Sequence, residues 1–296
     1  MFLLLAMLLQ VGPNPMAGGM QGDELVRDRP ARAELTRPDA SAPGAINATS
    51  AWLVSCFDQL EADPARAHTM AQIRRSETSG TDRVLANHCL GTASSELGLW
   101  DDARAAFIAA RTETPEAETR TRARFAALAG NAALAGGDAQ GAVDLFAMAQ
   151  ADARAAAAAP LEALAAIDKA RGLVALGRGD EALDALEAAT TLAPERSEGW
   201  LLKATLLRRM ERLDEAQAAI ERAAVLTPAN PEIGLEAGVI AVLSGRDDAA
   251  RQSWQSVIQL APDSPMAAAA NEYLAQLSPP QETAAPVPPQ QEQPQP

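Results

Sequence analysis

The chain has 296 residues, of which 48% are hydrophobic and 22% are charged, a balance typical of a soluble protein with enough apolar material for a core. Its formal net charge of −14 at pH 7 argues against a nucleic-acid surface, because binding to phosphates needs clustered lysine and arginine. Acidity of this kind mainly keeps a protein surface solvated.

The N-terminal residues form a short apolar run that is followed by proline, glycine and other small residues. The run is shorter than the roughly 20 apolar residues that cross a bilayer. It is typical of a secretory signal peptide, although no basic residue precedes it. We therefore expect residues 1–19 to be a signal peptide, and the mature chain to be periplasmic or secreted without a stable membrane span. The alternative is a cytoplasmic protein in which this run binds a membrane or a partner.

Three further segments outside the main pattern have distinct compositions. Residues 20–48 are polar and contain proline, which predicts a disordered linker. Residues 49–79 hold two helical patterns separated at Asp63-Pro64, and we interpret them as an N-terminal helical cap or a degenerate repeat. Residues 278–296 are rich in proline and glutamine, which predicts a disordered tail.

A 34-residue pattern recurs through the rest of the chain, and its clearest marks are Pro194, Pro228 and Pro262. A fixed period of this length indicates stacked structural repeats. With these prolines at position 32 of each repeat, the frame extends backwards to two more units. It does so after insertions of six residues before Ala163 and five before Ala123. The sequence thus predicts five repeats within residues 80–264.

Equivalent positions of the five units hold residues of similar size. Position 8 is always small: Gly91, Gly130, Ala170, Ala204 and Gly238. Position 20 is always alanine: Ala103, Ala142, Ala182, Ala216 and Ala250. Position 24 is always bulky: Phe107, Phe146, Leu186, Ile220 and Trp254. Small residues at positions 8 and 20 would let two helices approach closely, with the bulky residue beside the contact.

The ends of the helices are also marked. Glycine at position 15 is expected to end the first helix of a unit: Gly98, Gly137, Gly177 and Gly245. Aspartate at position 18 is expected to cap the second helix or to complement its positive end: Asp101, Asp180, Asp214 and Asp248. Each unit is therefore predicted to be a helix, a tight turn and an antiparallel helix.

These residues resemble the tetratricopeptide repeat family, which also often has tryptophan at position 4, as at Trp200. Arg154 departs from the pattern, because it replaces the proline of the second unit. The resemblance implies an all-α fold, a right-handed α-solenoid of antiparallel helix pairs with disordered termini. Residues 265–277 would form a capping helix that covers the last repeat.

The resemblance also implies where a ligand would bind, because the first helices of this family line a concave groove. Carrying over those positions gives an apolar track with an arginine cluster: Leu164, Ile167, Arg171, Val174, Glu198, Leu201, Thr205, Arg208, Arg209, Glu232, Leu235, Val239 and Val242. Such a groove could hold a protein segment, with arginines pairing with a carboxylate. The alternative is that Leu235, Val239 and Val242 simply pack between helices. The lysine and asparagine pattern with which family members clamp chaperone C-termini is absent.

The two cysteines, Cys56 and Cys89, lie on consecutive predicted helices. In an exported protein they would form a disulfide, and in a cytosolic one they would stay free thiols. His88 is next to Cys89, but neighbours on a helix point about 100° apart, which makes them a poor nucleophile and base. The two histidines and two cysteines have no metal-ligand spacing, and no cofactor motif occurs.

The predicted function is therefore a noncatalytic scaffold that binds a protein or peptide partner. We expect it to act in the bacterial periplasm, in envelope assembly, secretion or biogenesis. The alternative is a cytoplasmic accessory or regulatory subunit of a larger complex. No nucleic-acid partner and no cofactor are expected.

Overall fold

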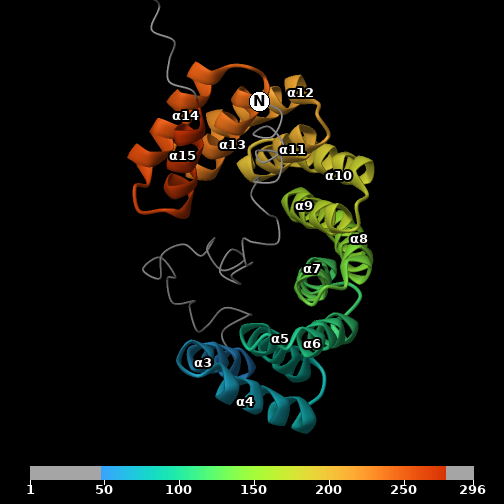
Figure 1. Cartoon of the computed structure of the whole chain (residues 1–296). Helices are drawn as coiled ribbons and strands as arrows, with labels where there is room; N and C mark the ends of the chain where they lie inside the picture. Colours follow the sequence, from blue (N-terminus) through green and yellow to red (C-terminus); the bar gives the residue numbers. More distant parts are fainter. Residues whose placement is uncertain (1–47, 278–296) are drawn as a thin grey trace, which may run out of the picture. The chain divides into compact units, whose positions relative to one another are not determined.

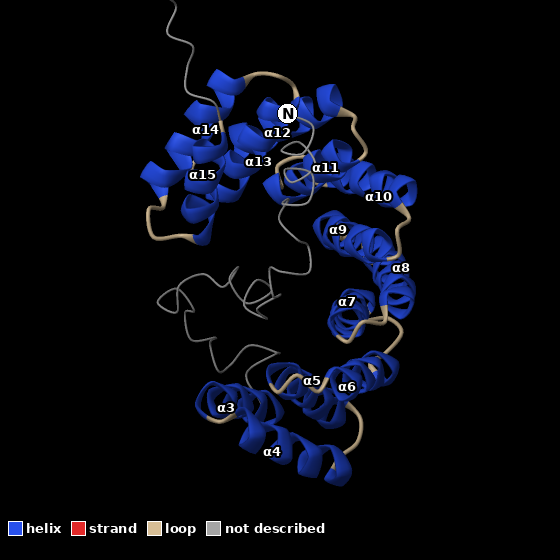
Figure 2. Ribbon diagram, in the orientation of Figure 1, coloured by secondary structure: helices blue, strands red, loops and turns tan. Residues whose placement is uncertain are grey.

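The computed structural model describes residues 48–277, and the predicted signal peptide, most of the linker and the tail lie outside these residues. The described part consists of helices joined by short loops, without a strand (Figure 2). Contacts divide it into two compact units, one ending at Pro228 and one beginning at Ala229. No helix among residues 48–277 is both long enough and apolar enough to cross a membrane.

Within residues 48–228, the first unit contains ten helices, which follow one another in antiparallel pairs. Figure 1 shows them stacked in chain order, with α5, α7 and α9 on one side of the stack and α6, α8 and α10 on the other. Their bounds are α3 Ala48–Ala62, α4 Pro64–Glu77, α5 Thr81–Glu96, α6 Trp100–Glu113, α7 Thr119–Ala135, α8 Ala139–Ala155, α9 Ala159–Ala175, α10 Gly179–Leu192, α11 Ser197–Arg209 and α12 Leu213–Leu226.

The second unit is a helix pair and a further helix: α13 Pro231–Leu243, α14 Asp247–Leu260 and α15 Pro265–Gln276. Tyr273 of α15 is buried, and its ring centroid lies 5.1 Å from that of Trp254 on α14. Ala267 and Ala270 complete the buried face of α15, whereas Asn271 and Glu272 are exposed. An amphipathic helix therefore covers α14, which is what the end of a helical stack requires.

The contact between the two helices of a unit depends on the small residue at position 8. A Cβ added to Gly91 would lie 2.6 Å from Cε1 of Phe107, which is closer than real side chains approach. Where the partner is the smaller Leu186 or Ile220, the facing position tolerates alanine, at Ala170 or Ala204. The bulky residue at position 24 therefore determines whether glycine is needed.

All five first helices end in the same way. The residue at position 15 is left-handed in each, with φ of +70° at Gly98, +86° at Gly137, +72° at Gly177, +60° at Glu211 and +73° at Gly245. The next residue donates its N–H to a carbonyl five residues back, as Arg212 does to Leu207 at 2.9 Å. This is the Schellman motif, which satisfies carbonyl groups at the helix end. Glu211 adopts it without glycine.

Of the two roles expected for the position-18 aspartates, the structure supports the second, which is to complement the positive end of the helix. Asp101, Asp180, Asp214 and Asp248 lie within the first turn of their helices, and their side chains cap no N–H group there. Their carboxylates instead sit near the positive end of the helix dipole. Asp138 does cap its helix, because it accepts a hydrogen bond from the N–H of Gly141 at 2.8 Å.

The inserted residues lengthen helices rather than loops. The helices α7 and α9 have 17 residues each, whereas α11 has 13, because both begin four residues before the start of the repeat frame. Since Arg154 replaces the helix-ending proline, α8 continues to Ala155. The Arg154 side chain then bonds Glu162 of α9, with Nε 3.0 Å from Oε1.

Candidate functional site

The predicted groove residues divide into two groups by burial. Leu164, Arg171, Val174 and Leu235 are partly exposed and Arg209 is exposed, so these five side chains reach the surface. Ile167, Leu201, Thr205, Arg208 and Val239 are buried, and Arg208 has no exposed surface at all. The buried five are part of the helix packing, so they do not present a surface to a ligand in this structure.

Arg171 is the best-ordered charged group on this face of α9. Its Nη1 lies 2.6 Å from Oδ1 of Asp168, and its Nη2 lies 2.5 Å from Oε1 of Glu198 on α11. Burial by itself would lower the pKa of Arg171, but the charges of Asp168 and Glu198 and their hydrogen bonds raise it above its usual value. The guanidinium is thus fixed between two helices, with 20% of its side chain exposed.

The arginines of the predicted cluster differ in their surroundings. Arg171 is already paired with two carboxylates, and Arg208 is buried. An incoming carboxylate at Arg171 would have to compete with Asp168 and Glu198.

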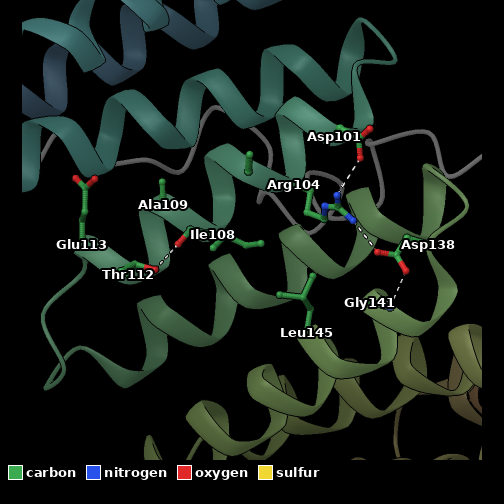
Figure 3. Close-up of a pocket in the computed structure, with 10 residues that line it drawn as sticks. Asp101, Arg104, Ile108, Ala109, Thr112, Glu113, Asp138, Gly141 and Leu145 are labelled. Atoms are coloured by element: carbon green, nitrogen blue, oxygen red, sulfur yellow. Dashed lines mark hydrogen bonds and ion pairs between the residues drawn. The ribbon is translucent and has the colours of Figure 1, made fainter.

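A second surface, which the sequence did not reveal, is a groove between α6 and α8. It has a volume of about 680 Å³, and Figure 3 shows its lining side chains. Ala105, Ile108 and Ala109 of α6 and Leu145 of α8 form its apolar part. The charged and polar lining residues are Asp101, Arg104, Thr112, Glu113 and Asp138.

Two ion pairs join α6 to α8, and the residues of the first also line this groove. Arg104 Nη1 lies 2.6 Å from Oδ2 of Asp138, while its Nη2 lies 3.0 Å from Oδ1 of Asp101 (Figure 3). Arg111 Nη2 lies 2.8 Å from Oδ2 of Asp152, and both side chains are 16% exposed. The two helices are thus held at a defined separation with apolar surface between the bridges.

The repeat frame identifies only part of this second surface. The two aromatic core residues of α6 and α8, Phe107 and Phe146, occupy position 24 and are buried. Ile108 follows Phe107 directly and is 40% exposed, as is Met148 on α8. In the sequence, this surface is indicated only by large apolar residues that lie just outside the predicted buried face.

At the N-terminal end, a disulfide joins Cys56 of α3 to Cys89 of α5, with the Cα atoms 6.4 Å apart. The residues that follow and precede these cysteines also meet, because the rings of Phe57 and His88 lie 5.2 Å apart in an edge contact. His88 also contacts Phe125, at 5.3 Å. Burial lowers the pKa of His88 from 6.5 to about 4, so its imidazole is neutral at pH 7.

Residues 48–277 contain neither a free thiol beside His88 nor a cluster of metal-binding side chains. Cys89 is held in the disulfide, so no thiolate stands beside His88. No group of three or more histidine, cysteine, aspartate or glutamate side chains within residues 48–277 is arranged to hold a metal ion.

Tandem antiparallel helix pairs with matched positions define this chain as an all-α solenoid of helical repeats. A family model of the tetratricopeptide repeat matches residues 167–231 and again residues 201–265. Residues 167–265 therefore match the tetratricopeptide repeat, a type of fold that suggests a scaffold for protein–protein interaction. Scaffolds of this kind are generally noncatalytic.

Solved structures of other proteins share the fold. The pilF protein of Pseudomonas aeruginosa aligns with a TM-score of 0.58 and 15% identity, over 77% of this chain and 97% of that one. BtubC (BKLC) from P. vanneervenii gives 0.53 and 15%, over 81% and 98% of the two chains. MamA (41-end) from Desulfovibrio magneticus RS-1 gives 0.51 and 18%, over 62% and 97%. A search of curated proteins finds no significant match.

Proposed function

We propose that the protein is a noncatalytic scaffold whose first-helix surface, formed by the exposed sides of α9 and α11, binds a segment of another protein. The observation that carries this proposal is the arrangement of Leu164, Arg171 and Val174 on one helix. Leu164 and Val174 are partly exposed aliphatic side chains ten residues apart, or about 15 Å along α9. Arg171 lies between them, fixed by Asp168 and Glu198.

Such an arrangement suits a segment that alternates apolar and backbone contacts. The aliphatic side chains supply area that is removed from water on binding. The guanidinium of Arg171 has five N–H groups, and the bonds to Asp168 and Glu198 use one on each terminal nitrogen. The remaining donors suit carbonyl oxygens of a bound segment, and because the guanidinium is fixed beforehand, binding costs less side-chain entropy.

The bacterial periplasm is the compartment we propose, with a role in envelope assembly, secretion or biogenesis. Two features support it. The Cys56–Cys89 disulfide would be stable in an oxidising compartment and is uncommon in the cytosol. The apolar run within residues 1–19 has the composition of a signal peptide.

The binding surface is tested by a double variant, Leu164→Glu with Val174→Glu. We expect it to lose the proteins that the wild-type chain retains after cross-linking in its native host, as identified by mass spectrometry. Val225→Glu is the matched control, because Val225 is 72% exposed on α12 and lies outside the proposed surface. Circular dichroism confirms that both variants fold. An unchanged set of cross-linked proteins in the double variant would exclude this surface.

The compartment is tested by the intact mass of the protein purified from its native host. Export predicts the loss of about the first 19 residues and a mass lower by two hydrogens, as expected for one disulfide. A full-length chain with both cysteines reduced would instead place the protein in the cytoplasm.

A further inference from the structure

We propose that the groove between α6 and α8 is a second docking site, which takes an amphipathic helix of a partner protein with aliphatic residues in its middle and lysine or arginine near both ends. This site lies on the second helices of the first two repeats. It is therefore separate from the proposed binding surface on α9 and α11, and the two proposals stand or fall independently.

The apolar floor of the groove is shaped to receive a helix. Ala105 and Ala109 lie one turn apart on α6, and Gly141 and Leu145 lie one turn apart on α8. Rows of residues spaced by four form the ridges and grooves through which helices pack. Because alanine and glycine are small, the backbone of a third helix could come close to both.

The exposed apolar surface in the groove is larger than packing requires. Ile108 is 40% exposed, whereas Ala106 and Ala110, which lie on the opposite side of α6, are fully buried. Figure 3 shows Ile108 and Leu145 projecting from facing helices toward the same space. An aliphatic side chain inserted between them would be removed from water together with Ile108, which favours binding.

The length of the groove sets the size of the occupant. Its lining on α6 runs from Asp101 to Glu113, twelve residues on, which corresponds to about 18 Å along the helix axis. About three turns of a partner helix cover this distance. An extended strand is less suitable, because no sheet edge exists within residues 48–277 to supply backbone hydrogen bonds.

Charge identifies the chemistry of the partner. Three carboxylates line the groove, those of Asp101, Glu113 and Asp138, against the single guanidinium of Arg104. The side chain of Asp101 is 92% exposed and that of Asp138 is 46% exposed, so both remain in contact with solvent near one end. Glu113 lies near the opposite end of α6, where its Oε2 is 2.7 Å from Nε of Arg83 and 24% of its side chain remains exposed. Basic residues at both ends of a helix would meet acidic groups at both ends of the groove.

The test uses a synthetic, fluorescein-labelled helical peptide of about 14 residues, long enough to span the groove. It carries leucines with a spacing of three and four residues and two lysines at each end. Two matched peptides replace either the lysines with glutamate or the leucines with serine. Fluorescence anisotropy with the full chain measures the dissociation constant of each. We expect binding of the leucine and lysine peptide alone.

Ile108→Glu is the decisive variant, and because Ile108 is partly exposed it should fold. We expect it to weaken peptide binding by at least about tenfold, since the insertion of aliphatic side chains is lost and acidic charge is added beside the leucines. Val225→Glu, a charge change of equal size elsewhere, should leave the dissociation constant within about twofold. The Leu164→Glu and Val174→Glu double variant should bind the peptide as the wild type does.

Three results would overturn the proposal. The first is equal binding of the peptide by wild type and Ile108→Glu. The second is equal binding of the lysine and glutamate peptides. The third is a wild-type chain that sediments as a dimer, does not bind the peptide and becomes monomeric on Ile108→Glu, because the groove would then be an interface between two copies.

Discussion

Gly130 of α7 and Phe146 of α8 fit each other so closely that a Cβ added to Gly130 would lie 2.5 Å from Cε1 of the phenylalanine ring. Phe146 is fully buried. In the following unit the same two positions hold Ala170 and Leu186, which are also buried. The chain thus contains two solutions to one packing problem, a glycine with an aromatic ring and an alanine with an aliphatic side chain.

We predict that Gly130→Ala lowers the free energy of unfolding by about 1 to 3 kcal/mol, because the added methyl group overpacks the helix contact. Phe146→Leu alone should also destabilise the protein, since it leaves unfilled volume. The double variant should recover part of the loss, as it recreates the pair found in the next unit. Urea unfolding of the four proteins gives the coupling free energy, and strictly additive losses would contradict the matched fit.

Glu211 carries a left-handed backbone, with φ of +60°, at a position where the other four repeats have glycine. A left-handed conformation costs a residue with a Cβ about 1 to 2 kcal/mol. Glycine removes that cost but adds about 0.4 to 1 kcal/mol of unfolded-state entropy. We therefore expect Glu211→Gly to stabilise the protein by about 0.5 to 1 kcal/mol in urea unfolding. A loss of stability would show that the Glu211 side chain makes compensating contacts.

Reduction of the Cys56–Cys89 disulfide should destabilise the N-terminal helices. The bond closes a loop across a sequence separation of 33 residues. On the chain-entropy model it contributes about 3 to 4 kcal/mol. Urea unfolding with and without dithiothreitol measures this contribution. A Cys56→Ser and Cys89→Ser double variant should match the reduced wild type and should unfold at the same urea concentration with and without dithiothreitol. If the wild-type unfolding curve is also unchanged by dithiothreitol, the bond adds no stability.

His88 makes stability depend on pH. The pKa of His88 is about 4 in the folded protein and 6.5 when unperturbed. Between pH 4 and pH 6.5 the imidazole is therefore protonated in the unfolded chain and neutral in the folded chain. Stability therefore falls as the pH falls from about 6.5 to about 4, by about 1.4 kcal/mol for each unit of pKa difference. We expect His88→Phe to lose less stability than the wild type between pH 7 and pH 4.5, by about 2 to 3 kcal/mol. Parallel losses would contradict a neutral imidazole at His88.

Arg208 and its neighbour Arg209 should respond differently to charge reversal. Arg208 has no exposed surface, so Arg208→Glu would bury a carboxylate among groups arranged for a cation, at a cost of about 3 kcal/mol or more. Arg209 is exposed, and Arg209→Glu should change stability by less than about 1 kcal/mol. Thermal unfolding of the two variants makes the comparison, and a similar melting temperature for both would contradict the burial of Arg208.

The sequence predicted the repeat well because its period depends on local contacts. Gly91 with Phe107 and Gly238 with Trp254 occupy positions that the 34-residue frame already aligned. In the structure the two residues of each pair meet between the two helices of one hairpin. The glycines at the ends of first helices were predicted for the same reason. Glu211 was not, because a left-handed glutamate has no residue-type signal.

The candidate surfaces were harder to predict, because exposure depends on how neighbouring units pack. The repeat frame assigned Ile167 and Arg171, four residues apart, to one groove, but Ile167 is buried and Arg171 is not. The groove between α6 and α8 requires a gap that two ion pairs maintain, Arg104 with Asp138 and Arg111 with Asp152. Partners 34 and 41 residues apart cannot be recognised from the sequence of a single chain.

The matched fit of positions 8 and 24 also bears on how such a chain can grow. Because glycine and phenylalanine, or alanine and leucine, face each other within one helix hairpin, a tandem duplication of the coding segment copies both partners at once. The new hairpin arrives with its internal contact intact. The number of repeats can therefore change in evolution by whole hairpins. A single substitution at position 8 or 24 is instead selected against, because it disturbs the fit between the two helices.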